Sequence, residues 1–157
     1  MDAIPITRRG YEKLQEELTF LKTVERPKVV EAIAAARVLG DLSENAEYHS
    51  AKDRQGLIEA RIIDIEGKIS KASIIDVSKI VSNTIKFGAT IELIDESTGV
   101  ISKFQIVGSC EADIQNGLLP ITSPLARALI GKAVGDVVEV RSPGGVRTYE
   151  ISALKYV

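Results

Sequence analysis

Two apolar seams at helical spacing in the first 72 residues constrain the fold of this chain more than any other feature. The first seam consists of Tyr11, Leu14, Leu18 and Leu21, and the second of Ile58, Ile62, Ile65, Ile69 and Ala72. Alternating steps of three and four residues are typical of the contact line of a coiled coil. When the seams are placed antiparallel, the facing residues have numbers that add to 83, as Leu18 and Ile65 do. The sequence therefore predicts a two-helix hairpin that folds back between residues 41 and 42.

Local signals place the ends of the two predicted helices. Thr7 is a suitable N-cap for the first helix, and Gly40 is a suitable C-terminal cap at its end. Pro27 interrupts the pattern because proline has no backbone N–H and clashes with the preceding turn. We therefore expect a kink there, or a short break after which the helix restarts. The second helix is expected to begin at Leu42–Ser43 and to run to about Ala72. With about 30 residues in each helix, the hairpin is a rod roughly 45–50 Å long.

The pattern changes from helical spacing to strand-like alternation after residue 72. Strands are expected at residues 74–77, 90–94, 100–107, 137–140 and 148–151, with turns at 96–99 and 142–145. Ser123-Pro124 is typical of the capped start of a short helix, which ends at Gly131. The predicted fold class is α+β: an N-terminal antiparallel two-helix coiled coil over residues 1–73, followed by a small α+β domain with a mostly antiparallel sheet over residues 74–157.

Composition excludes several classes of function. Residues 1–73 carry 12 Lys or Arg against 13 Asp or Glu, and residues 74–157 carry 8 against 9, so each part has a formal charge of −1. Neither part is a basic domain that binds DNA or RNA on its own. The single cysteine, Cys110, excludes an internal disulfide and a cysteine-based zinc site. No apolar run approaches the roughly 20 residues that span a bilayer, and no signal-peptide pattern occurs, so we expect a cytoplasmic protein without membrane contact.

Within the predicted tip of the hairpin, Gly40-Asp41-Leu42-Ser43-Glu44-Asn45-Ala46-Glu47-Tyr48, the acids Asp41 and Glu44 stand three positions apart at the turn. Side chains at i and i+3 can face the same side of a helical turn, so the rod would deliver Asp41 and Glu44 together to a distant site. A second interpretation needs no partner, because Asp41 as an N-cap with Glu44 three residues later would resemble a capping box. Both interpretations can hold, since a cap would also orient the carboxylates.

The tip motif, continued by His49, resembles that of the GreA/GreB family of bacterial transcript cleavage factors, and the GreA form more closely. A second match is the run Ser123-Pro124-Leu125-Ala126-Arg127-Ala128-Leu129-Ile130-Gly131-Lys132, followed by Gly135-Asp136 and Pro143-Gly144-Gly145. The resemblance covers essentially the whole chain. It implies a coiled coil that enters the secondary channel of RNA polymerase and an FKBP-like C-terminal domain that docks at the rim of this channel.

The resemblance also implies a function. In backtracked complexes the tip acids of the family help to hold a second Mg²⁺ in the polymerase active site, and the polymerase then cleaves its own transcript. By the motif match, Asp41 and Glu44 take that role here, so the chain is a cofactor of an enzyme and not itself an enzyme. The chemistry agrees, since Mg²⁺ typically takes only one or two carboxylates from a protein. We expect a monomer that shares this Mg²⁺ with the polymerase and does not bind it stably when free.

Three cations lie within roughly three helical turns of the tip, Arg37, Lys52 and Arg54. Together with Ser43 they are expected to contact the RNA 3′ end or the polymerase, because cations of this kind commonly bind phosphate. The alternative is that the cations pair with acids on a solvated helix face. The acids considered are Glu31, Asp53 and Glu47.

Two further functions remain open from the sequence. One is a non-cleaving regulator or inhibitor with the same architecture, bound in the secondary channel. The other is a prolyl isomerase, which an FKBP-like fold suggests. It is disfavoured because residues 74–157 contain too few aromatic side chains to line an apolar pocket. These are Phe87, Phe104, Tyr149 and Tyr156. At the tip, Tyr48 and His49 are expected to pack and to stiffen the loop and not to catalyse.

Overall fold

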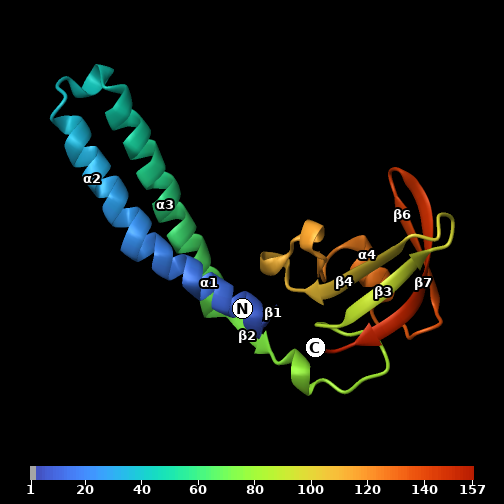
Figure 1. The fold of residues 1–157 in the computed structure, drawn as a ribbon. Coiled ribbons are helices and arrows are strands. Elements are labelled where there is room, and N and C mark those ends of the chain that lie inside the picture. The colour runs from blue at the N-terminus through green and yellow to red at the C-terminus, as the bar shows by residue number, and fades with distance from the viewer. Residues whose placement is uncertain (1–2) are drawn as a thin grey trace. The chain divides into compact units, whose positions relative to one another are not determined.

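The structure, a computed structural model, describes residues 3–157, which divide into two compact units (Figure 1). The first unit is Tyr11–Ala72, and the second consists of Ala3–Gly10 and Ser73–Val157. The sequence analysis assigns residues 3–10 to the hairpin domain. In the structure these residues pack with the C-terminal unit, because strand β1 (Ile4–Thr7) pairs there with strand β2 (Ala72–Ile75).

The first unit is a helical hairpin. Its elements in chain order are α1 (Arg8–Phe20), the π-helical turn η1 (Leu21–Glu25), α2 (Arg26–Arg37), the 3-10 turn η2 (Leu42–Glu44) and α3 (Ala46–Lys71). Figure 1 shows α2 and α3 side by side, joined by a short loop that contains η2. The antiparallel hairpin predicted from the two seams is confirmed.

The contact between the arms is made by apolar side chains, and Leu14, Ile58, Ile62 and Ile65 of the predicted seams are among the buried ones. The buried ones are Leu14, Val29, Ile33 and Ala36 on the first arm and Ala51, Ile58, Ile62 and Ile65 on the second. Leu18 and Leu21 pack against the cluster formed by Val29, Ile58 and Ile62. Burial of each large aliphatic side chain stabilises the hairpin by roughly 1.5–3 kcal/mol relative to exposure. The seam therefore both holds the arms together and sets which residues face each other.

Ion pairs between the two arms also favour this register of the helices. Arg61 binds Glu17 through two bonds of 2.7 Å, and Arg26 binds Glu59 through two bonds of 2.8 Å. The hydrogen bond from Arg61 holds the pKa of Glu17 below its usual value, and the bond from Arg26 does the same to the pKa of Glu59. A bidentate pair requires both partners at matched heights, so these contacts disfavour a slipped pairing of the helices.

Pro27 neither breaks the first arm nor leaves it purely α-helical. The π-helical turn η1 immediately precedes α2, and the N–H of Arg26 donates to the carbonyl of Leu21 five residues earlier. Pro27 then falls in the first turn of α2, the one part of a helix in which its missing N–H has no cost. The break expected as one alternative at Pro27 is not found, because α1, η1 and α2 follow one another without an interruption and Phe20, Glu25 and Arg26 keep right-handed helical angles.

The helix ends at the tip differ from those predicted. Helix α2 ends at Arg37 and not at Gly40, whose φ of +121° places it in the turn that follows. Helix α3 begins at Ala46 and not at Leu42–Ser43, because Asn45 is extended (φ −87°, ψ 96°) and separates η2 from α3. Its C-terminal end at Lys71 agrees with the expectation.

The second unit contains a five-stranded sheet with the order β5-β4-β3-β7-β6. Its strands are β3 (Thr90–Asp95), β4 (Ile101–Val107), β5 (Leu118–Pro120), β6 (Val137–Ser142) and β7 (Gly145–Lys155). All neighbours are antiparallel except β4 and β5. Single 3-10 turns lie between these strands and before them, at η3 (Val77–Lys79), η4 (Ser109–Glu111) and η5 (Ile114–Asn116). The predicted α+β domain with a mostly antiparallel sheet is confirmed.

Helix α4 (Pro124–Leu129) packs its apolar side on this sheet. Ser123 caps its N-terminus by accepting a bond from the N–H of Ala126, as predicted. Ala126 and Leu129 are completely buried in a core with apolar residues of the strands. The strand residues of this core include Ile91, Leu93, Ile106, Leu119, Val138 and Ile151. At the turn between β3 and β4, the carboxylate of Asp95 accepts bonds from the N–H and the hydroxyl of Ser97.

Candidate functional site

The loop at the end of the hairpin places both predicted acids in solvent. Asp41 and Glu44 are exposed, and they flank the single 3-10 turn Leu42–Glu44. Oδ1 of Asp41 accepts a 3.0 Å bond from the N–H of Ser43 and a 2.8 Å bond from its hydroxyl. These backbone and side-chain bonds hold the pKa of Asp41 below its usual value, so its carboxylate stays ionised. Asp41 is thus a cap, as the second interpretation expected, but it caps a 3-10 turn and not helix α3.

Asn45 supplies the cap of α3 and also joins the two arms. Its Oδ1 accepts a 3.0 Å bond from the N–H of Tyr48, and its Nδ2 donates a 2.6 Å bond to the carbonyl of Ala36 at the end of α2. A single side chain therefore connects the last turn of one helix to the first turn of the other. The sequence analysis did not single out Asn45, although asparagine is among the preferred N-cap residues.

Aromatic and basic side chains brace the loop on the α3 side. The guanidinium carbon of Arg37 lies 5.9 Å from the ring centroid of Tyr48, within the range of a cation–π contact. The rings of Tyr48 and His49 meet nearly edge to face, with centroids 5.5 Å apart. Nε2 of His49 lies 3.2 Å from the carbonyl oxygen of Ser43. These contacts give Tyr48 and His49 places in the framework of the tip.

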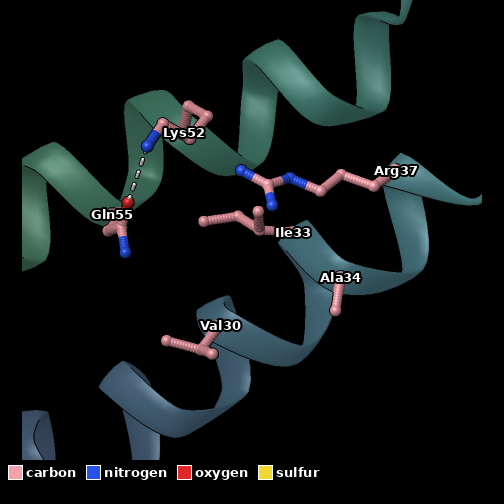
Figure 2. Close-up of a pocket in the computed structure, with 6 residues that line it drawn as sticks. All are labelled: Val30, Ile33, Ala34, Arg37, Lys52 and Gln55. Carbon is pink, nitrogen blue, oxygen red and sulfur yellow. Dashed lines mark hydrogen bonds between the residues drawn. The ribbon is translucent and has the colours of Figure 1, made fainter. Parts of the chain in front are cut away.

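A groove between α2 and α3 brings two of the predicted cations together (Figure 2). It has a volume of about 380 Å³ and is lined by Val30, Ile33, Ala34, Arg37, Lys52 and Gln55. Figure 2 shows Arg37 extending from α2 toward α3, while Lys52 donates a 3.3 Å bond to Gln55 on its own helix. Arg54 is not part of this groove, since it pairs with Glu25 at 3.4 Å. The expected pairing partners of these cations, Glu31, Asp53 and Glu47, are not the ones found.

The donor set limits how this tip can bind a metal. Within residues 3–157 no group of three or more His, Cys, Asp or Glu side chains is arranged to hold a metal ion. The exposed carboxylate oxygens of Asp41 and Glu44 are nevertheless of the hard type that Mg²⁺ prefers. Both bonds from Ser43 end on Oδ1, so Oδ2 of Asp41 can serve as a ligand. The residues fit a magnesium ion whose other ligands come from elsewhere.

Comparison with known proteins assigns both units. Residues 4–74 match the N-terminal domain model of GreA/GreB transcription elongation factors, and residues 80–156 match the C-terminal domain model of the same factors. The chain belongs to the GreA/GreB family of transcription elongation factors. The family assignment made from the tip motif and the second motif is therefore confirmed.

Similarity to individual GreA/GreB proteins extends over the full chain. The transcription elongation factor GreA of Methylobacterium sp. (strain 4-46) is 58% identical over 157 residues, which is 100% of this chain and 99% of that protein. GreA of Phenylobacterium zucineum is 57% identical over the full length of both chains. Among solved structures, GreA factor homolog 1 of Thermus thermophilus is 26% identical and covers 98% of this chain and 99% of its own, with a TM-score of 0.45. No helix within residues 3–157 is long and apolar enough to cross a membrane.

Proposed function

We propose that this elongation factor inserts its helical hairpin into the secondary channel of RNA polymerase and stimulates the polymerase to cleave backtracked RNA. The observation that carries the proposal is the exposed pair Asp41 and Glu44 at the turn of the hairpin. Helix α3 has 26 residues and is thus about 39 Å long, so the acids are displaced far along the arm from its junction with β2. Such an arm can carry two carboxylates into a narrow channel. The polymerase is the enzyme, and this chain is its cofactor.

Mg²⁺ shared with the polymerase is part of the proposal. In a two-metal site the ions stabilise the attacking and leaving oxygens of an in-line phosphoryl displacement. Asp41 and Glu44 would contribute ligands to the second ion, and the polymerase and the RNA would contribute the rest. The bonds from Ser43 lower the pKa of Asp41 and fix one of its oxygens, which reduces the ordering that must occur on binding.

The cations of the groove support a role close to the RNA. Arg37 and Lys52 lie on facing arms and line one groove, and phosphate contacts from such side chains fix the position of a nucleic acid without reading its sequence. We assign them to the RNA 3′ end of the backtracked transcript or to polymerase acids. Arg54 is a weaker candidate because Glu25 already neutralises it. Ser43 acts mainly through Asp41, since its hydroxyl donates to that carboxylate.

The test uses purified backtracked elongation complexes, the full chain and Mg²⁺. Wild-type protein should release short RNA fragments that carry new 3′ ends. Asp41→Ala and Glu44→Ala should each lower the stimulated cleavage rate about 100-fold, the scale expected for one preorganised electrostatic group, with polymerase affinity nearly unchanged. Asp53→Ala serves as the matched control, because Asp53 is an exposed acid on α3 away from the turn, and it should keep full activity.

Two results would count against the proposal. Full cleavage by both tip variants would exclude the metal role of the acids. Binding of the wild-type chain to the polymerase without any new fragment would instead indicate the non-cleaving regulator of the same architecture.

A further inference from the structure

The side-chain amide of Asn45 has an orientation that its partners determine. The carbonyl of Ala36 can only accept a hydrogen bond and the N–H of Tyr48 can only donate one. Nδ2 of Asn45 must therefore face Ala36, at 2.6 Å, and Oδ1 must face Tyr48, at 3.0 Å. The residue is half-buried, and both bonds lie in partly buried surroundings. Asn45 uses both ends of its amide, one for each arm of the hairpin.

These two bonds close the loop that holds the acids. Residues 37–44 lie between the two anchoring points, and Asp41 and Glu44 are both among them. A second contact, from His49 to the carbonyl of Ser43, ties the middle of the loop to α3. Ser43 in turn holds the carboxylate of Asp41. The side-chain contacts thus run from His49 through Ser43 to Asp41, and Glu44 is placed by its position in the chain directly before Asn45.

We propose that Asn45 is the positioning residue of the acid pair, and that it acts by strapping the end of α2 to the start of α3. This inference rests on the proposed function of Asp41 and Glu44. Capping of α3 does not by itself require asparagine, because serine and aspartate cap a helix about as well. Only asparagine among these three also supplies an N–H donor to the carbonyl of Ala36. A loop held in this way presents its carboxylates already ordered, so less conformational freedom is lost when the second metal site is completed.

Two substitutions separate the role of the hydrogen bond to Ala36 from the role of the helix cap at Tyr48. Asn45→Ser and Asn45→Asp both keep a cap oxygen for Tyr48 and both lose the donor to Ala36. Each should lower stimulated cleavage at saturating factor about tenfold, the effect of one or two lost hydrogen bonds on the reactive geometry. The Mg²⁺ concentration for half-maximal cleavage should rise severalfold, while affinity for the polymerase stays within about twofold. A variant that merely folds less well would change the amount of active factor and leave the Mg²⁺ dependence as it is.

A matched control addresses the stability of α3. Gly56 is exposed within α3, and a Cβ added there meets no atom within 4 Å, so Gly56→Ala should stabilise the helix. Placed in the Asn45→Ser background, Gly56→Ala should not restore cleavage if Asn45 positions the loop. Restoration of full cleavage by Gly56→Ala would show that Asn45 acts only through helix stability, and the proposal would be overturned.

A measurement on the free chain tests the strap without the polymerase. Amide order parameters of residues 42–44 should fall in Asn45→Ser from the rigid range near about 0.85 toward about 0.6 or below. Unchanged order parameters, or wild-type cleavage by both Asn45 variants, would refute the positioning role. Failure of the proposed function itself has a different signature, because Asp41→Ala would then cleave at the wild-type rate while the loop of Asn45→Ser would still become mobile.

Discussion

The packing of Gly10 against Glu111 predicts that replacing this glycine by alanine lowers stability, although helix propensity alone would predict a gain. Gly10 is buried in the first turn of α1, and glycine to alanine in a helix ordinarily stabilises by roughly 0.5–1 kcal/mol. A Cβ at this position would fall on Oε1 of Glu111 and 2.6 Å from its Cδ. The carboxylate would therefore have to move. Gly10→Ala is expected to destabilise the second unit, to which both residues belong.

The size of the effect follows from the bonds that this carboxylate accepts. Glu111 receives the N–H of Thr7 at 2.8 Å, the N–H of Gly108 at 3.0 Å and the hydroxyl of Thr7. Thr7 and Gly108 are buried, and a buried donor left without its partner costs about 1–3 kcal/mol. The hydroxyl can rotate to another acceptor, so the two N–H groups dominate. The two N–H groups together cost about 2–6 kcal/mol, and after subtraction of the gain in propensity Gly10→Ala should lower the free energy of unfolding of this unit by about 1–5 kcal/mol.

Urea unfolding followed by NMR signals of Ile91 and Leu93 reports on the second unit, because both side chains lie in its core. The double-mutant cycle with Glu111→Ala should give a coupling energy of about 2–6 kcal/mol, since the clash disappears with the carboxylate and only a 3.1 Å contact to Cβ remains. Gly56→Ala, the same substitution at an open helical site, should stabilise the hairpin. Stabilisation by Gly10→Ala, or additivity with Glu111→Ala, would refute the reasoning that the bonds of Glu111 to Thr7 and Gly108 are lost when a Cβ is added at Gly10.

Two further predictions concern charged groups. The hydroxyl and N–H of Ser97 hold the pKa of Asp95 below its usual value. The ionised carboxylate therefore stabilises the folded state at any pH above the unfolded pKa of about 3.9, and this stabilisation is lost as the pH falls through the lower pKa of the folded state. Asp95→Asn should therefore lower the urea midpoint of unfolding at pH 7. The difference in midpoint between this variant and the wild type should be smaller at pH 3, and a difference in midpoint that does not depend on pH would contradict the prediction. For the bidentate pair of Arg61 and Glu17, a double-mutant cycle should give a coupling energy of only about 0.5–1 kcal/mol, because both side chains are 40% exposed. Loss of this coupling energy at high salt would support its electrostatic origin.

Features that depend on a fixed period of burial were predictable from the sequence. Leu14, Ile58, Ile62 and Ile65 recur at three and four residues, and burial of that stripe admits one antiparallel register. The turn between β3 and β4 was predictable for a local reason, because Asp95, at the end of the strand, and Ser97 form an Asx turn within four residues. In both cases the residues that decide the structure are close in sequence or regular in spacing.

The tip and the N-terminal segment were less predictable because distant partners decide them. Asp41, Ser43 and Asn45 are all good cap residues within five positions, and local preference does not rank them. The bond from Asn45 to Ala36 decides in favour of Asn45, and it exists only after the two arms have packed. Similarly, residues 3–10 join the second unit through Glu111, which lies about 100 residues later in the chain.

The tip also explains, on the proposed function, why this chain would need the polymerase to hold Mg²⁺. Two exposed carboxylates are fewer ligands than a protein site for Mg²⁺ requires without water or phosphate, and within residues 3–157 no three His, Cys, Asp or Glu side chains are grouped so that they could hold a metal. A tip with a complete ligand set would bind the ion in solution and would have to lose ligands before it could share the ion with a second protein. Asp41 and Glu44 would avoid this, because Ser43 orients the carboxylate of Asp41 and Asn45 connects the ends of the loop, while the remaining ligands of the metal would come from the polymerase and the RNA. Order in the loop, and not affinity for the metal, is then the property on which the contribution of this chain depends.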